Sequence, residues 1–599
     1  MGRDETLTPR AVEGMIADGG ILVIYEEHVL KLNGWMSRHP GGSLAILHMV
    51  GRDATDEMKA LHSASTLQTI KAFRIGRKPA GPWTNMTPPI RGGVYRKPQT
   101  IDASPDLIID RAYLSETDSS VSDSESSSSP HSAKDGLAPL DDQRSLASSV
   151  TSVYNSSDDD SVEALKKKVC SASDLLGPDM TGLRQRALPP PAREAKLDAI
   201  RRLSPTEYTA WAVEQDIDRD LSEYPSLEPA VQQDITQKYR DLHQKVQDMG
   251  YYECPYTEYG KECIRYITLF TGFITLLHYE WYIASAICLG VFWQQIMFTA
   301  HDAGHRAITH VFWIDTLIGL FIADLCCGLS IGWWKSSHNV HHLITNQPEH
   351  DPDIQNLPLF ATSPLYFRGI TSSYYNGFVF AWDKAAELLV PIQKYTYYPI
   401  MAIARFNLYL LSWLHVLSSK STGLGSTKAW WIRPTEMAFM TGYWFLFGYC
   451  LLWRSLPTWT IRVVFVLVSH VFMAPLHVQI NLSHWGMSTS DLGEGESFPQ
   501  RQLRTTMDVD CPAWMDFVHG GLQFQAIHHL FPRVPRHNLR KVQGLVREFC
   551  QDTGIPYSIL TFVDGNKKVL GRLGEVGEQV SMLVNCQKHM AETGEMGLH

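Results

Sequence analysis

Long apolar segments in the second half of the chain constrain its fold more than any other feature. From residue 259 onward the sequence becomes aromatic and apolar. Four stretches are candidate membrane-spanning helices: 264–278, 281–300, 437–453 and 460–477. Because each stretch is short, two transmembrane hairpins are expected rather than four independent anchors. The sequence therefore predicts an α-helical integral membrane domain over 259–555, followed by a C-terminal tail over 556–599.

Two further apolar stretches, 311–334 and 397–417, compete for the same assignment. The first contains Asp315 and Asp324 and separates two histidine clusters. If it crossed a membrane once, those clusters would lie on opposite faces and could not share a metal site. We therefore expect 311–334 to be interfacial or re-entrant.

Residues 8–78 have the size and the alternation of short apolar runs and turns that favour a small α+β domain. His39-Pro40-Gly41-Gly42 predicts a sharp turn, in which proline fixes φ and the glycines permit the reversal. His62 follows later in the domain. Two imidazoles on opposite faces of a haem fill both axial positions, which favours electron transfer over oxygen chemistry. These residues resemble cytochrome b5, and the resemblance implies that His39 and His62 are the axial ligands of haem b.

The segment between the two domains is polar. Residues 111–160 contain 16 serines and few large apolar side chains, so they cannot bury enough surface to offset the entropy of ordering. We interpret 79–204 as a disordered Ser/Asp-rich linker. Ser204-Pro205 and Glu207 then predict the start of a polar helical lead-in over 205–258.

Three histidine clusters stand in the membrane half, each after an apolar segment. Within each cluster the spacing places imidazoles on one helix face, so that they meet near the membrane surface. Imidazole binds iron, copper, zinc or nickel, but a fused redox domain favours a metal that is reduced before it binds O2. So many ligands fit two ions better than one. The predicted ligands are His301, His305, His338, His341, His342, Gln525, His528 and His529.

The order HxxxH, HxxHH and QxxHH resembles the front-end desaturases of the membrane di-iron family. That resemblance implies two iron ions held by a cytosolic histidine cap, with glutamine at the position of Gln525. Asn481-Leu482-Ser483-His484 resembles the site where related enzymes supply an extra histidine, so His484 is a further candidate ligand. Asp302 is expected to hold an imidazole tautomer rather than to bind metal. Four other histidines remain candidates, with a structural role preferred for each: His310, His470, His477 and His519.

The b5 fusion, the Ser-rich insertion and the sequence from Phe524 to Pro532 are most similar to the fungal Δ8 sphingolipid desaturases. The resemblance implies an O2-dependent desaturation of the long-chain base of ceramide. It also implies NADH-cytochrome b5 reductase as electron donor and an endoplasmic reticulum membrane location, with the haem domain and histidine boxes in the cytosol. Alternatives are a Δ6 or Δ5 front-end fatty acyl desaturase and a related lipid hydroxylase. A haem-binding membrane adaptor with a vestigial desaturase half is a non-enzymatic alternative.

Charge and cysteine content exclude other classes. The net charge is −10 and no basic stripe is present, which argues against nucleic-acid binding. Ten cysteines without CxxC spacing favour a reduced, cytosol-facing protein. The charged N-terminus has no apolar h-region, so internal segments are expected to carry the chain into the membrane.

Overall fold

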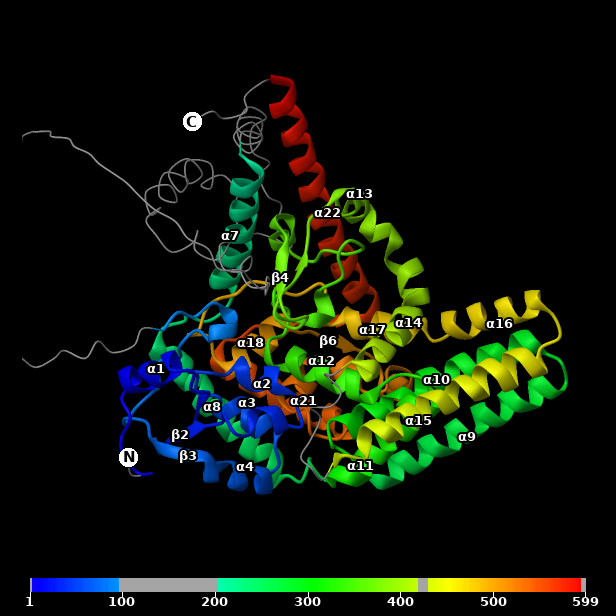
Figure 1. Cartoon of the computed structure of the whole chain (residues 1–599), viewed down its shortest axis with the longest axis horizontal. Coiled ribbons are helices and arrows are strands. Elements are labelled where there is room, and N and C mark those ends of the chain that lie inside the picture. The colour runs from blue at the N-terminus through cyan, green and yellow to red at the C-terminus, as the bar shows by residue number, and fades with distance from the viewer. Residues whose placement is uncertain (1–2, 96–202, 419–428, 594–599) are drawn as a thin grey trace, which may run out of the picture. The chain divides into compact units, whose positions relative to one another are not determined.

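The computed structural model describes residues 3–95, 203–418 and 429–593, and all statements below concern these residues (Figure 1). The interpretation of 111–160 as a flexible linker lies outside them. The N-terminal part begins with α1 (Pro9–Ala17), where Thr8 accepts a hydrogen bond from the Ala11 backbone and Pro9 occupies the first turn.

The N-terminal domain is the predicted α+β unit. Its antiparallel sheet has the order β1 (Leu22–Tyr25), β2 (His28–Lys31) and β3 (Arg74–Arg77). Short helices fill the interval between β2 and β3: η1 (Met36–Arg38), α2 (Ser43–Leu47), α3 (Thr55–Leu61), α4 (Ala64–Ile70) and η2 (Lys71–Phe73). Buried side chains such as Leu22, Ile24 and Val29 form its core.

Residues 79–95, expected to belong to the linker, instead pack on folded parts of the chain. Trp83 donates to the Gly51 carbonyl at 2.9 Å. Arg91, in η3 (Pro89–Arg91), forms an ion pair with Asp491 at 2.8 Å. The described part of the predicted linker is therefore folded, because the apolar and charged side chains that follow residue 78 have partners that only the tertiary structure brings near.

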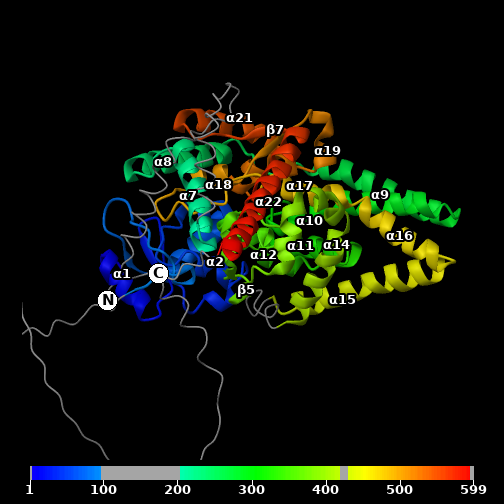
Figure 2. The ribbon, with the colours of Figure 1, turned by 90° about the horizontal axis from the view of Figure 1, so that it is seen from above.

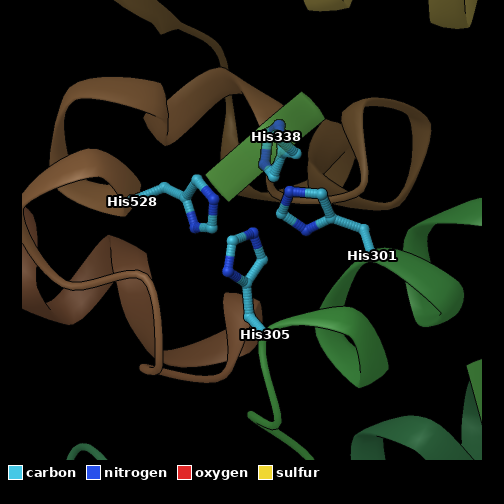
Figure 3. A group of neighbouring side chains, drawn as sticks. All are labelled: His301, His305, His338 and His528. Atoms are coloured by element: carbon cyan, nitrogen blue, oxygen red, sulfur yellow. The ribbon is translucent and has the colours of Figure 1, made fainter. Parts of the chain in front are cut away.

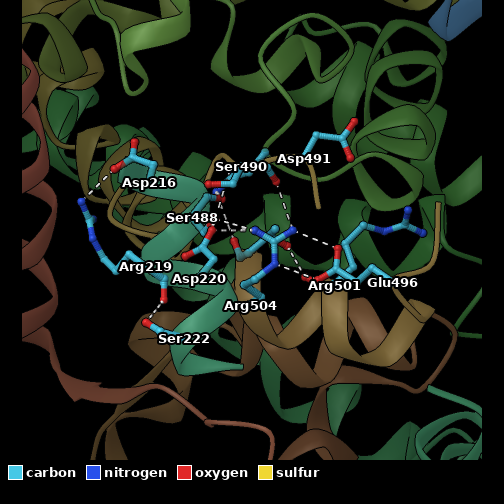
Figure 4. A network of polar contacts seen from close by, with 12 residues as sticks. Asp216, Arg219, Asp220, Ser222, Ser488, Ser490, Asp491, Glu496, Arg501 and Arg504 are labelled. Atoms are coloured by element: carbon cyan, nitrogen blue, oxygen red, sulfur yellow. Dashed lines mark hydrogen bonds and ion pairs between the residues drawn. The ribbon is translucent and has the colours of Figure 1, made fainter. Parts of the chain in front are cut away.

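The predicted helical lead-in is confirmed as two helices. α7 (Pro205–Glu223) starts with a capping box, in which the Ser204 and Glu207 side chains each accept a hydrogen bond from the other's backbone N–H. α8 (Pro229–Asp248) follows. Buried Arg504 then ties α7 to the later chain through Asp220 at 3.1 Å and Glu496 at 2.8 Å (Figure 4).

The membrane half is mainly helical. α9, α10, α15 and α16 lie side by side in both views (Figures 1 and 2). The first part of this half holds α9 (Tyr256–His278), α10 (Tyr282–Gly304), α11 (Phe312–Gly319), the π-helix η4 (Leu320–Cys326), α12 (Ile331–Leu343), α13 (Lys384–Leu389) and α14 (Gln393–Leu417). The second part holds α15 (Ile432–Trp444), the π-helix η10 (Phe445–Ser455), α16 (Trp459–Val471), α17 (Ala474–Leu482), α18 (Phe498–Thr505), α19 (Asp516–His519), α20 (Gln525–Leu530), α21 (Arg536–Thr553) and α22 (Phe562–Thr593).

Two short sheets complete the fold. β4 (Ile370–Ser372) pairs with β5 (Phe378–Phe380) in antiparallel fashion. β6 (Asp508–Asp510) pairs in parallel with β7 (Ile559–Thr561).

Three helical segments are long and apolar enough to cross a membrane: Tyr282–Gly304, Lys384–Leu417 and Trp459–Leu482. The first and third coincide with the predicted spans 281–300 and 460–477. The predicted spans 264–278 and 437–453 are helical but are not among these segments, whereas 397–417, which the sequence left open, belongs to one. The number of membrane hairpins stays a prediction.

The stretch 311–334 is broken, as expected for a re-entrant segment. Phe312–Cys326 and Ile331–Leu343 meet at an angle of 115°. The outward faces of the neighbouring helices are apolar, including Ile264 and Ile267 on α9 and Val463 on α16. Such faces are suited to contact with lipid.

The C-terminal tail predicted for 556–599 is wrong for its described part. β7 joins the parallel pair with β6, and the long helix α22 buries Val569 and Leu573 in a cluster with Tyr397 of α14. The folded membrane half therefore continues well beyond residue 555.

Candidate haem and metal centres

His39 and His62 face one another across a single pocket. His39 ends η1, and Gly42, with φ of 85°, turns the chain into α2. His62 ends α3. The centroids of the two rings lie 5.9 Å apart, a separation that suits one metal ion between two imidazoles.

The hydrogen bonds of both rings leave a nitrogen free for a metal. Each Nδ1 lies against a backbone carbonyl, that of Gly42 at 2.9 Å for His39 and that of Met58 at 3.0 Å for His62. Because carbonyls only accept, each Nδ1 carries the proton and each Nε2 keeps its lone pair. Burial lowers the pKa of His39 and lowers the pKa of His62 to about 3, so both rings are neutral at pH 7. The surrounding side chains are mostly apolar, including Leu32, Ile46 and Phe73.

The wall of this pocket is completed by the membrane half. Gly304, His305, Arg306, Lys335, Asn339, Leu343 and Arg533 line it together with residues of the N-terminal domain. Ion pairs join the two halves nearby, between Arg240 and Asp56 at 2.7 Å and between Arg501 and Glu57 at 3.1 Å. Direct contacts as well as the intervening segment therefore join the haem domain to the membrane half.

The first metal-binding group draws on all three predicted histidine clusters. Imidazole nitrogens of His301, His305, His338 and His528 lie within 4.8 Å of one another, and Figure 3 shows the four rings converging. His301 lies in the last turn of α10 and His305 caps the same helix. His338 comes from α12 and His528 from α20. The Nε2 atoms of His301, His305 and His528 are buried without a hydrogen-bond partner among the described residues.

A second group lies beside the first. It contains His341, His484 and His529, whose ligand atoms again lie within 4.8 Å of one another. Burial and neighbouring imidazoles hold the pKa values of His484 and His529 well below their usual range, so these rings are neutral and able to bind metal. His484 thus lies where the resemblance places an extra ligand.

Two predicted ligands lie at the edges of these groups. His342 approaches His338 with 3.0 Å between the Nε2 atoms, and its ring centroid is 4.2 Å from that of His529. Gln525 begins α20, and its buried Oε1 has no partner among the described residues. An acceptor oxygen left unpaired in the interior suits a metal or a metal-bound group.

Several side chains orient the imidazoles. Asp351 accepts from His341 Nδ1 at 2.8 Å, and Gln502 accepts from His529 Nδ1 at 2.9 Å. Each contact directs the opposite nitrogen towards the metal group. Asp302 lies 3.6 Å from His301 Nδ1, just beyond hydrogen-bond distance, and forms an ion pair with buried Arg536, so its expected orienting role stays a prediction. The sequence missed Asp351, although its place in His350-Asp351-Pro352-Asp353, close after the second cluster, was a usable signal.

The other candidate histidines do not join either group. His310 lies against two backbone carbonyls, His470 against that of Val466 and His477 against that of Met401, while His519 pairs with Gln479. The structural interpretation preferred for each fits these contacts. Two adjacent groups of imidazoles, several of them oriented by hydrogen bonds, therefore fit two metal ions.

Comparison with protein families agrees with this architecture. Residues 8–78 match the cytochrome b5-like haem/steroid binding domain, over the range expected from the sequence, and residues 280–561 match the fatty acid desaturase family. The chain is thus a cytochrome b5 domain fused to a desaturase domain.

Curated relatives are similar over the whole length. A Delta 8-(E)-sphingolipid desaturase of Emericella nidulans is 45% identical over 598 residues, covering 100% of this chain and 99% of the relative. One of the same name from Candida albicans is 42% identical, covering 96% of each. A Delta(8)-fatty-acid desaturase of Helianthus annuus is 35% identical over 59% of this chain and 76% of its own length. The protein belongs to the cytochrome b5-fused branch of the fatty acid desaturase family and is an oxidoreductase.

Proposed function

We propose that the protein is a sphingolipid 8-desaturase, which inserts a C=C bond at the Δ8 position of the long-chain base of ceramide. The observation that carries this proposal is the convergence of histidines from separate segments into two adjacent groups, in a chain similar end to end to proteins named for this activity. The relatives' names also support the (E) geometry for the new double bond.

The ligands are proposed as follows. His39 and His62 would hold haem b. The two metal groups would hold iron, through His301, His305, His338, His341, His342, His484, His528 and His529, with Gln525 as a ligand or a close neighbour. Two irons, when bound, would supply the redox chemistry by which O2 takes two hydrogens from adjacent carbons, together with two electrons from the haem and two protons, and is reduced to two molecules of water.

The chain's own residues provide position and exclude water. The candidate ligands His301 and His305 lie at the end of α10, an apolar helix long enough to cross a membrane, so a lipid chain in the bilayer can reach them. Asp351 and Gln502 fix the tautomers of two ligands before substrate arrives. Burial of all these rings keeps bulk water from the reacting carbons.

Electrons would enter through the haem. NADH-cytochrome b5 reductase is the proposed donor, which places the haem domain and the histidine groups on the cytosolic side of the endoplasmic reticulum membrane. Two membrane hairpins are proposed to carry the histidine cap. His305 lines the haem pocket and also belongs to the first metal group, so the two redox sites share a wall.

The test is product analysis in cells that lack their own Δ8 desaturase. We expect the intact protein to yield ceramides with a Δ8-unsaturated long-chain base, and a His528→Ala variant to yield none. New double bonds confined to fatty acyl chains would instead support the Δ6 or Δ5 alternative, and hydroxylated chains would support a hydroxylase. Iron-free purified protein would favour the adaptor.

A further inference from the structure

The haem pocket contains three cations that the N-terminal domain does not supply. Arg306, Lys335 and Arg533, here called the cationic triad, come from the membrane half and line the pocket. Among the described residues, no lysine or arginine of the N-terminal domain lines this pocket, and the one acidic lining residue, Glu57, already pairs with Arg501.

The triad lacks carboxylate partners within the described ranges. Lys335 donates to the Gly304 carbonyl at 2.8 Å, Arg306 packs over the Phe312 ring at 4.7 Å, and Arg533 approaches His310 at 3.5 Å. All three side chains are partly buried. Burial and the nearby Arg533 lower the pKa of Arg306, while Asp315, which forms no ion pair with the triad, acts in the opposite direction on all three cations.

Haem b brings two carboxylates into a pocket whose N-terminal side is apolar. A carboxylate buried against Leu32 or Phe73 would be left without a partner, which disfavours its charged form. The cationic triad is the complementary charge, and it stands on the opposite wall. The haem carboxylates would therefore find cationic partners only when both halves of the chain meet around the haem.

We propose that Arg306, Lys335 and Arg533 bind the carboxylate groups of the haem, so that the haem is held by both halves of the chain. This inference rests on the proposed binding of haem by His39 and His62. It assigns the triad a positioning role, because it would fix the carboxylate edge of the haem beside His305. Arg306 directly follows His305 in the sequence. A residue proposed to bind the haem would therefore be adjacent along the chain to a residue proposed to bind iron.

The approach of the His39 turn to α12 supports this arrangement. Asn339, between the ligands His338 and His341, lies 3.4 Å from where a Cβ on Gly41 would stand. A side chain at Gly41 would also meet the His39 ring at 2.8 Å. The turn that holds one haem ligand is therefore in close contact with the helix that carries the second histidine cluster.

The experiment compares haem with its dimethyl ester in the full-length protein. Esterification removes the two carboxylate charges and leaves the ring and its iron unchanged. Apoprotein would be reconstituted with either haem, and haem loss to excess apomyoglobin would be measured. The variant carries Arg306→Gln, Lys335→Gln and Arg533→Gln. The matched control, Arg240→Gln, removes a cation that pairs with Asp56 across the same halves but does not line the pocket.

We expect the wild type to prefer haem over the ester by on the order of 100-fold, about tenfold for each charge-assisted pair. The triple variant should bind the two equally, while Arg240→Gln should keep the preference. The haem midpoint potential should also fall in the triple variant, because nearby cations stabilise the more negative reduced haem. An undiminished preference for haem over the ester in the triple variant would overturn the proposal.

Two further measurements keep the outcome clear. If the triple variant does not fold, Arg306→Gln alone should reduce the preference and Arg306→Lys should restore it, and a failure of both would count against the triad. A low-spin bis-imidazole spectrum in the wild type tests the proposed haem site separately. Its absence would refute haem ligation by His39 and His62, whereas a normal spectrum with an unchanged ester preference would refute only the triad.

Discussion

The haem pocket and the metal groups both consist of histidine ligands, but the ligands of the two sites are oriented by different kinds of contact. In the haem pocket, both ligand histidines are oriented by backbone carbonyls within four residues of themselves. In the metal groups, His529 is oriented by Gln502, 27 residues away, and His341 by Asp351, 10 residues away. The haem ligands depend on local chain geometry, whereas the metal ligands depend on how α10, α12, α18 and α20 pack. Substitutions that disturb the packing of these helices should therefore affect metal binding more than haem binding.

The largest effect is expected from His528→Ala. This substitution removes an imidazole from the first metal group. The centroid of the His528 ring lies 4.6 Å from that of His301 and 4.7 Å from that of His305. Iron content should fall and desaturation should stop, while the haem spectrum stays normal. The measurements are the amount of iron per protein and the amount of desaturated product. His310→Asn is the matched control, since asparagine tolerates the φ of 61° at that position and His310 lies outside both groups. Retention of full iron in His528→Ala would contradict the assignment.

The converse variant is His62→Ala. It should abolish the low-spin haem spectrum and stop desaturation in cells without a separate cytochrome b5, yet leave iron content intact. The reason is that His62 belongs to neither metal group. Loss of iron together with haem would show that the shared wall at His305 couples the two sites, and full activity would refute the role of the fused haem.

Two variants of Gln525 distinguish whether this residue binds iron or orients a neighbouring ligand. Gln525→Ala should remove most activity, and Gln525→His should retain part of it if the position binds iron, because imidazole is a good iron ligand. If Gln525 only orients a neighbour, both variants should be equally damaging and iron should stay at the wild-type level. Iron per protein alongside turnover decides between them. Normal turnover in Gln525→Ala would exclude both roles.

Asp351→Asn tests the long-range orientation of the metal ligands. Losing the carboxylate that accepts from His341 should weaken iron binding roughly 10- to 100-fold. Asp353→Asn is the control, because its carboxylate lies 3.7 Å from the same Nδ1, beyond hydrogen-bond distance. Competition with a chelator measures the difference. Equal iron loss in both variants would indicate a general charge effect instead of orientation by Asp351.

The smallest effect is expected from deleting 111–160. Each halving of a flexible connection changes its closure free energy by only about 0.6 kcal/mol. The contacts of Arg240 and Arg501 with the haem domain remain in place. Activity and haem content should therefore change little. Complete loss of activity in a stably expressed deletion would show that the segment has a role of its own.

The sequence by itself determined the parts that rest on local patterns. It predicted the haem domain over 8–78 with His39 and His62 in one pocket, and the histidines that enter the two metal groups. It also predicted the capped start of the helical lead-in and an interfacial or re-entrant course for 311–334. The turn, the helix cap and the three histidine clusters follow from short-range patterns, whereas the haem ligands and His484 were implied by resemblance to known families.

Only the tertiary structure decided what depends on contacts between distant segments. The division of the histidines into two groups, the orienting roles of Asp351 and Gln502, and the burial of α22 all come from packing that no local pattern records. The same holds for the docking of the haem domain, where Arg52 and Arg91 meet acidic residues some 400 positions away. A charged side chain does not indicate its partner in the sequence, because an ion pair is specified by distance in space and not by distance along the chain.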